Sequence, residues 1–476
     1  MRARDGWTLA GGRWGGGTGD ETFTVTDPAT GEPVGEAPIC SAADVEDAVD
    51  AASAAAPGWA AVPAAERGAA LRAAADAVEE RADELAALVT SEMGKPADDS
   101  RGGVEAGIGT LRQYAELGPL HGGRSLQGGR TAADLMVREP RGVVTVITPW
   151  NDPVAIACGL IGAAVVTGNT VVHKPSERTP HAGALLAELL AGRLPDGVLN
   201  LVTGDGATGD LLAAHPRPDV VAHVGSTRAG RRIAELAARN GAKALLENGG
   251  TDPLIVDAGV DPRWAAGQAA LGCFANAGQI CTSVERVYVH ESVHAGFLEA
   301  LAERARRTRT GSGFDPATEL GPLVDERHRA RVHEHVEKAV ADGARLLAGG
   351  EIPAGPGAFY PATVLDGCTD AMAIMTEETF GPVAPVRAVA SFDAALDAAR
   401  RARHGLAATV LTRDMAHARR AWRELPVGTV KVNAVFGGAP GGAATPRGAS
   451  GEGFGYGPEL LDEMTAVKVV HIETAP

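Results

Sequence analysis

The sequence predicts an α/β protein built around two parallel β-sheets, with a small third sheet outside them. Short β-branched segments alternate with segments of helical periodicity from residue 141 to residue 247, and the alternation restarts after residue 247. Strands that alternate with helices form a parallel sheet with helices on both faces, so each run predicts one such sheet. Two β-like segments far apart in the chain, at 118–138 and 465–472, lie outside both runs. They predict the third sheet, whose free edge is suited to pairing across subunits.

The individual elements follow from apolar spacing and breaker residues. Residues 42–93 are rich in Ala, Leu, Glu and Arg at helical spacing and are interrupted by Pro57 and Pro63, which predicts two or three helices. In the first run we expect strands at 141–147, 170–173, 198–202 and 220–224, and helices at 182–190, 209–214 and 228–240. In the second run we expect strands at 253–256 and 284–289, and helices at 265–275 and 293–309. The Gly-rich segment 118–138 predicts a hairpin that leaves the first lobe, and 465–472 predicts a terminal strand.

The composition predicts a folded protein of two or three lobes with no nucleic-acid partner. The chain has 476 residues, of which 45% are hydrophobic and 22% are charged, near the averages of globular proteins. Its net charge is -16, and its densest basic segment, 304–309, is short. Because phosphate binding needs an extended basic face, these features argue against DNA or RNA binding.

The cysteines and the N-terminal residues predict a cytoplasmic protein. The five cysteines are odd in number and show no CxxC spacing, so they indicate neither a disulfide framework nor a zinc site. Residues 1–19 are charged and Gly-rich where a signal peptide would be apolar, and no segment has the length of a membrane helix. Spacings of five and two do not place His328, His333 and His335 on one helix face, so we expect no metal site and a solvated helix there.

Three short segments carry candidate chemistry. Cys281 follows a Gly-Gln turn in 276–283 (NAGQICTS) and is either a nucleophile or an inert core residue like Cys273, eight positions earlier. Glu247 ends a strand before two glycines and is either a base or a solvated strand end. Asn151 closes a strand in 148–153 (TPWNDP) and either aims its amide at developing negative charge or serves the turn.

Together and in this order, these segments resemble the aldehyde dehydrogenase superfamily. The resemblance spans nearly the whole chain, from 27–31 (DPATG) to Val467-Lys468, and includes 174–177 (KPSE), 225–230 (GSTRAG) and 378–383 (ETFGPV). It implies two Rossmann-like parallel-sheet domains with a small oligomerisation β-sheet, and a homodimer or homotetramer. We assign the NAD-binding domain to 1–118 and 139–247, the catalytic domain to 248–445, and the oligomerisation strands to 119–138 and 446–476.

The resemblance also implies a mechanism for these residues. Cys281 attacks the aldehyde carbon, and the amide of Asn151 with the backbone N–H of Cys281 stabilises the oxyanion. After hydride transfer to the nicotinamide, Glu247 activates the water that hydrolyses the thioester. The alternatives are a CoA-acylating dehydrogenase, which needs no water-activating Glu247, and a non-catalytic homologue, which would not need all three residues.

The implied cofactor is NAD, with NADP as the alternative. The pyrophosphate would lie at 225–230, where a helix begins, in preference to the literal GxGxxG at 204–209. Glu177 would repel a 2'-phosphate, which favours NAD, although the neighbouring Arg178 weakens this preference. We assign cofactor binding to Trp150, Lys174, Ser176, Glu177, Gly225, Ser226, Gly230, Glu378 and Phe380.

The sequence departs from the resembled family at three places near the chemistry. The family usually has Leu-Gly-Gly-Lys after the base, whereas this chain has 248–251 (NGGT), which puts the pKa and mobility of Glu247 in doubt. Asp152 and Arg447 stand where the family often has aromatic residues of the substrate tunnel. Arg447 either binds an anionic group of the substrate, such as the carboxylate or phosphonate of a semialdehyde, or it pairs with Asp152 or points to solvent.

Overall fold

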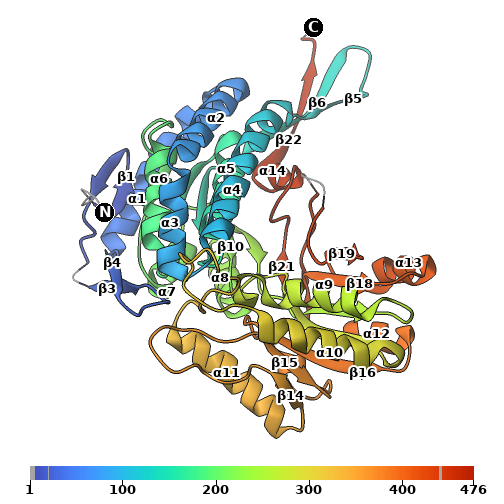
Figure 1. Cartoon of the computed structure of the whole chain (residues 1–476). Helices are drawn as coiled ribbons and strands as arrows, with labels where there is room; N and C mark the ends of the chain where they lie inside the picture. The colour runs from blue at the N-terminus through green and yellow to red at the C-terminus, as the bar shows by residue number, and fades with distance from the viewer. Residues whose placement is uncertain (1–5, 20, 439–441, 476) are drawn as a thin grey trace.

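The computed structural model of the chain describes residues 6–19, 21–438 and 442–475. Two large sheets, each flanked by helices, lie one above the other in the view of Figure 1, and a narrow antiparallel sheet extends from the upper one. The predicted α/β class and the small third sheet are confirmed. Within the described residues, no helix combines the length and the apolar character needed to cross a bilayer.

The first sheet has eight strands with a parallel centre. In spatial order the strands are β2 (Arg13–Gly15), β1 (Thr8–Ala10), β9 (Leu199–Leu201), β8 (Thr170–Lys174), β7 (Val143–Ile147), β10 (Val220–Val224), β11 (Lys243–Glu247) and β21 (Gly451–Glu452). The strands from β9 to β11 are parallel to one another, whereas β1 and β21 join antiparallel. The four strands that the sequence predicted here are confirmed, with ends that differ by no more than two residues.

Alternation along the central strands divides the helices between the two faces of this sheet. Val144 and Val146 of β7 belong to the largest core of this lobe, whereas Val143 and Ile147 belong to two smaller cores on the other face. The first face is covered by α5 (Pro153–Val166) and α6 (Pro180–Ala191), with α2 (Ala64–Glu80), α3 (Ala82–Met93) and α4 (Ala97–Leu117) packed behind them. The second face is covered by α1 (Ala42–Ala61), α7 (Gly206–Ala214) and α8 (Thr227–Asn240).

The sequence predicted that Pro57 would interrupt a helix, and this prediction is wrong. The helix α1 continues through Pro57 to Ala61, and Pro63 instead precedes α2. Pro57 is exposed and lies in the last turns of α1, where it removes a single backbone hydrogen bond. The buried indole of Trp59 donates to Val165 O at 2.9 Å, and this tertiary contact holds the end of the helix in place.

The second sheet has seven strands, again with a parallel centre. In spatial order they are β14 (Arg345–Ala348), β15 (Thr363–Asp366), β16 (Val383–Val389), β13 (Val284–His290), β12 (Asp252–Val256), β18 (Ala407–Leu411) and β19 (Thr429–Val432). The helices α9 (Pro262–Phe274), α10 (Glu291–Arg307), α11 (Glu326–Ala341), α12 (Phe392–Ala399) and α13 (Met415–Glu424) enclose it around one continuous core. The strands and helices predicted up to residue 309 are confirmed.

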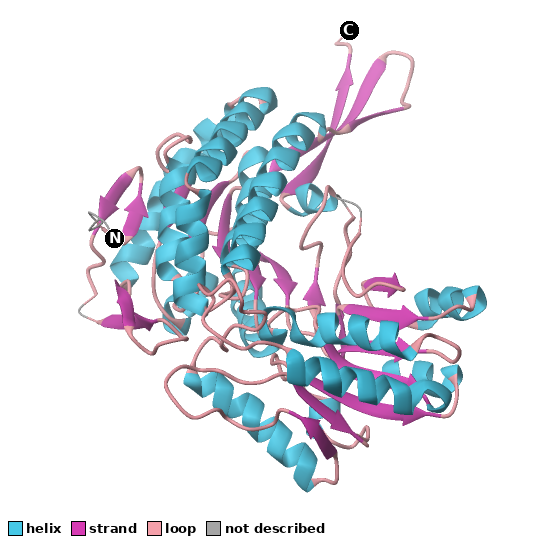
Figure 2. Cartoon of the chain, in the orientation of Figure 1, coloured by secondary structure: helices cyan, strands magenta, loops and turns pink. Residues whose placement is uncertain are grey.

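The small sheet is antiparallel and stands away from the two lobes (Figure 2). β22 (Thr465–Glu473) pairs along its whole length with β6 (Ala132–Pro140), which pairs on its other side with β5 (Arg124–Leu126). Hence the predicted hairpin and the terminal strand do form one sheet. The remaining elements are β3 (Thr22–Thr26), β4 (Pro33–Pro38), β17 (His404–Gly405), β20 (Arg447–Gly448), α14 (Glu459–Glu463) and three short 3-10 helices, η1 (Gly118–Leu120), η2 (Ala275–Gly278) and η3 (Ala373–Met375).

Candidate active site

The three candidate catalytic residues meet between the two large sheets. Asn151 follows β7 and Glu247 ends β11, so both lie at the carboxyl edge of the first sheet. Cys281 precedes β13 and therefore lies at the amino edge of the second sheet. The site is thus formed where the carboxyl edge of one sheet faces the amino edge of the other.

Cys281 and Glu247 are in direct contact. The Cys281 thiol donates a hydrogen bond to Glu247 Oε1, with a sulfur–oxygen distance of 3.3 Å. Burial and the neighbouring Glu247 charge raise the pKa of the Cys281 thiol, and burial also raises the pKa of the Glu247 carboxyl. Cys281 is partly exposed, whereas Cys40, Cys158, Cys273 and Cys368 are buried. Among the five thiols, Cys281 alone combines access with an adjacent proton acceptor.

A strained turn presents Cys281. The backbone is left-handed at Asn276 (φ 48°), Ala277 (φ 55°) and Gly278 (φ 72°), and the two non-glycine residues cost about 1 to 3 kcal/mol each. Gln279 offsets this strain from its buried position, because its amide donates to Asn276 O at 3.1 Å and accepts from Val324 N at 2.9 Å. The turn therefore holds the cysteine in one place before the substrate arrives.

Asn151 is tied to the same turn. Its Nδ2 donates to Gln279 O at 3.0 Å, and Asn276 Nδ2 donates to the same carbonyl at 3.1 Å. Asn151 is 8% exposed, so its amide is nearly free of competing water. The Asn151 amide is therefore fixed against the carbonyl of Gln279, two residues before Cys281 in the chain.

Residues predicted to bind adenosine lie at the carboxyl end of β8 and directly after it. Lys174 is buried, and its ammonium donates to Pro175 O at 3.0 Å. Ser176 Oγ lies 3.5 Å from the Glu177 carboxylate. Arg178, which complicated the cofactor prediction, pairs with Asp325 at 2.7 Å and lies over the Trp150 ring at 5.2 Å. Its guanidinium is therefore ion-paired with a residue of the second lobe.

The predicted pyrophosphate segment begins α8 at the carboxyl end of β10. Ser226 caps the helix and accepts from Ala229 N at 3.2 Å. Gly230 packs so closely against Asn248 that a Cβ there would lie 1.9 Å from the Asn248 amide oxygen. This close approach joins the helix start to the residue after Glu247.

The predicted nicotinamide segment is clamped against the catalytic loops. Glu378 Oε1 accepts from Gly250 N at 3.0 Å, and burial raises the pKa of Glu378 to about 7. A Cβ at Gly249 would lie 2.1 Å from the same carboxylate, so a larger residue there would displace Glu378. The Phe380 ring meets the Trp150 ring edge-on, with 5.5 Å between their centroids.

His328 corrects the prediction of a solvated helix. It is 4% exposed, and its Nε2 donates to Phe380 O at 2.7 Å. Burial lowers the pKa of His328 to about 4, so the ring is neutral. His328 lies at helical spacing from the buried Val332, Val336 and Ala339, so the apolar face of α11 was the signal that could have identified it.

Asp152 and Arg447 do not pair with each other. Asp152 lies 3.5 Å from the buried ammonium of Lys95. Arg447 is exposed and belongs to β20, which pairs with β17. The segment that carries Arg447 is nevertheless bound to the site, because Ser450 Oγ donates to Gly249 O at 2.8 Å and Asn248 N donates to Ser450 O at 2.8 Å.

Three buried charged residues near the site, Asp252, Glu285 and Arg286, and the partly buried Lys431 were not identified from the sequence. Glu285 accepts from the backbone beside Glu378, and Arg286 Nε donates to Thr251 O at 2.7 Å. Lys431 interacts electrostatically with Asp252 and Cys281. A charged residue inside an apolar β-segment, such as Glu285 in 284–289 (VERVYV), is the one signal that could have identified them.

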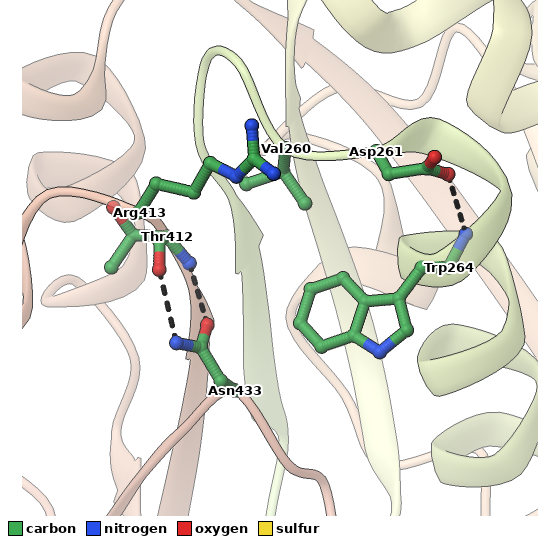
Figure 3. Close-up of a pocket in the computed structure, with 6 residues that line it drawn as sticks. All are labelled: Val260, Asp261, Trp264, Thr412, Arg413 and Asn433. Atoms are coloured by element: carbon green, nitrogen blue, oxygen red, sulfur yellow. Dashed lines mark hydrogen bonds between the residues drawn. The ribbon is translucent and has the colours of Figure 1, made fainter.

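A separate cavity of about 320 Å³ lies at the other edge of the second sheet (Figure 3). It is lined by Val260, Asp261 and Trp264 after β12, by Thr412 and Arg413 after β18, and by Asn433 after β19. None of the predicted site residues lines it.

Comparisons with known proteins agree on one family. A model described as the aldehyde dehydrogenase family matches residues 14–470. A non-phosphorylating aspartate-semialdehyde dehydrogenase from Halomonas elongata is 38% identical over 432 residues, covering 89% of this chain and 87% of the relative.

Solved structures agree over nearly the whole chain. Betaine aldehyde dehydrogenase from Staphylococcus aureus, solved in complex with NAD+, superposes with a TM-score of 0.96 at 32% identity and covers 98% of this chain and 95% of its own. A 3,6-anhydro-L-galactose dehydrogenase superposes with a TM-score of 0.95 at 34% identity, covering 98% of this chain and 99% of its own.

Proposed function

This chain belongs to the aldehyde dehydrogenase family, and we propose that it oxidises an aldehyde to the carboxylic acid through a thioester on Cys281. The contact between the Cys281 thiol and Glu247 carries this proposal, because it joins a nucleophile to a proton acceptor. Asn151, fixed on the same turn by Gln279, supplies the amide for the oxyanion.

The chain's own residues account for the proton transfers and the positioning. Glu247 takes the thiol proton as Cys281 bonds to the aldehyde carbon, and Asn151 with the Cys281 N–H stabilises the oxygen. Bound NAD supplies the hydride acceptor. Glu247 releases the thiol proton to solvent and then takes a proton from water as the water attacks the thioester; the carbon–sulfur bond breaks, the acid is released, and return of that proton to the sulfur restores the thiol.

We propose NAD as the cofactor, held along the carboxyl edge of the first sheet. The residues present fit a dinucleotide: α8 begins at the carboxyl end of β10, where its N-terminal amides suit a pyrophosphate. Lys174 and Glu177 would bind the adenosine ribose, and Glu378 with Phe380 would bind the nicotinamide half. Because Arg178 pairs with Asp325, Glu177 is left to repel a 2'-phosphate, which favours NAD over NADP.

We propose an anionic semialdehyde as the substrate, with Arg447 as its anion contact. Within residues 6–19, 21–438 and 442–475 Arg447 forms no ion pair, and its segment lies against Gly249. The similarity to an aspartate-semialdehyde dehydrogenase supports the same substrate class.

An initial-rate panel tests these proposals. Aliphatic, aromatic, amino- and acid-bearing aldehydes are compared with NAD and with NADP, and the product is identified as the acid or, with CoA present, as a CoA thioester. We expect acid from an acid-bearing aldehyde with NAD. Formation of a CoA thioester as the product would favour the acylating alternative.

We also propose the three-part division made from the sequence, with the small sheet joining subunits. Val467, Val469 and Ile472 of β22 are 45%, 66% and 55% exposed, which is unusual for β-branched residues in a paired strand. Light scattering should find a dimer or tetramer, and Val469→Lys should lower its mass. A monomeric wild-type enzyme would contradict this assignment.

A further inference from the structure

A single buried carboxylate holds the backbone of the 378–380 segment. Glu285, in β13, is 5% exposed. Its Oε2 accepts from Thr379 N at 3.0 Å and its Oε1 accepts from Phe380 N at 3.0 Å. Phe380 is left-handed, with φ 54°, a conformation that needs such external support in a bulky residue.

The segment held by Glu285 touches both catalytic loops. Glu378 accepts from Gly250 N, three residues after Glu247. A Cβ at Gly278, three residues before Cys281, would lie 2.1 Å from Gly381 O. A shift of the segment would therefore move the Glu378 carboxylate and the Phe380 ring relative to the thiol.

We propose that Glu285 is a positioning residue for the cofactor: by accepting the N–H groups of Thr379 and Phe380, it places Glu378 and the Phe380 ring to bind the nicotinamide half of NAD. The inference rests on the proposed function, because that function assigns Glu378 and Phe380 to the cofactor. Glu285 itself touches neither the substrate nor the cofactor in this arrangement.

The acidic groups around Glu285 disfavour its ionised form. The carboxyls of Glu378 and Asp252 and the thiol of Cys273 interact with it electrostatically. Burial and the charge of Glu378 raise the pKa of Glu285 to about 8. Glutamine, which carries no charge at any pH, has one carbonyl oxygen and could accept only one of the two N–H groups in the present geometry.

The direct test compares cofactor binding in Glu285→Gln and wild type. NAD binding is measured by calorimetry without aldehyde, and KM for NAD and kcat are measured with saturating aldehyde. Losing one of the two hydrogen bonds should raise the Kd and KM for NAD about tenfold. The rate of iodoacetamide alkylation at Cys281 should stay within about twofold, because the thiol's own contacts are kept.

Two further variants separate positioning from general stability. Asp257→Asn alters a comparably buried carboxylate at the opposite edge of the same sheet and should lower the melting temperature without changing the Kd for NAD. In a Glu378→Gln background, Glu285→Gln should raise the Kd by a smaller factor than it does in wild type, because one of the two groups that Glu285 positions has already been altered.

The possible outcomes distinguish failure of the Glu285 proposal from failure of the proposed aldehyde oxidation. A folded Glu285→Gln enzyme with NAD affinity within about twofold of wild type would overturn it. If Glu285→Gln does not fold, Glu285→Asp is used, which keeps the carboxyl group but is too short for both bonds, and the same thresholds apply. Failure of the wild type to bind NAD or to oxidise any aldehyde would instead overturn the proposed function.

Discussion

The two parallel sheets place their candidate functional residues at opposite edges. In the first sheet, Asn151, Lys174, Gly225 and Glu247 all follow or end strands, at the carboxyl edge where parallel sheets usually bind ligands. In the second sheet, Cys281 precedes its strand, and the carboxyl edge bears the cavity of Figure 3, which none of the predicted site residues lines. The two edges of the second sheet are separated by strands roughly 17 Å long.

This difference shows that strand direction alone does not locate a site. The second sheet meets the first with its amino edge, so its short connections at that edge carry the chemistry. Strained backbone collects there as well, at Asn276, Ala277 and Phe380. At the carboxyl edge Asn433 is also left-handed, but its amide exchanges two hydrogen bonds with the Thr412 backbone and so serves the fold.

The largest effect is expected for Cys281→Ser, at the amino edge. Aldehyde oxidation should fall by about a thousandfold or more, because a hydroxyl is a far weaker nucleophile than a thiolate at neutral pH. NAD affinity should stay within a few-fold. Retention of more than a few per cent of the activity would show that Cys281 is not the nucleophile.

Glu247→Gln should separate the two halves of the reaction. In a stopped-flow experiment one rapid round of NADH formation per active subunit should precede a stall at the thioester, with steady-state turnover about a hundredfold lower. Rapid-quench mass spectrometry should detect the acylated enzyme. An unchanged steady-state rate would assign water activation to another group.

Arg447→Ala should change selectivity between substrates. For an acid-bearing semialdehyde kcat/KM should fall about ten- to several hundred-fold, the ~1.5 to 3 kcal/mol of a charge-assisted bond. A neutral aldehyde of equal length should lose little. Arg413→Ala, at the cavity on the carboxyl edge of the second sheet, is the matched control and should leave both values unchanged. Equal losses for the two aldehydes would leave Arg447 with a structural role.

The pH dependence of turnover should reflect the raised pKa of Glu247. The carboxyl must be ionised to take a proton, so the rate of thioester hydrolysis should rise with pH through that pKa. The acidic limb should therefore lie above pH 4.5, the ordinary value for glutamate. Its persistence in Glu247→Gln would assign the limb to a different group.

The smallest effect on activity is expected at the carboxyl edge of the second sheet. Asp257 is 4% exposed and accepts from the Thr412 hydroxyl and from His417, both at 2.6 Å. Asp257→Asn should lower the free energy of unfolding by about 1 to 3 kcal/mol in denaturant titrations. A change of kcat or KM beyond about twofold would show that the carboxyl edge of the second sheet also contributes to activity.

Local pattern was sufficient to predict most of the secondary structure. Apolar alternation and helix-start signals located strands such as β10 and helices such as α8 within one or two residues. The same signals failed at Pro57, where the contact between Trp59 and Val165 overrides a helix-breaking residue. Motif order was specific enough to nominate Cys281, Glu247 and Asn151, and the structure brings these residues together.

The sequence by itself determined the α/β class, the family and the candidate catalytic residues, because these depend on periodicity and on motifs whose members lie close together in the chain. The tertiary structure alone decided the rest: that Asp152 pairs with Lys95, that His328 is buried against Phe380, and that Glu285 holds the segment beyond Glu378. Glu285 and Phe380 are 95 residues apart in the chain. Such partners are chosen by the packing of whole sheets and helices, which no local pattern encodes.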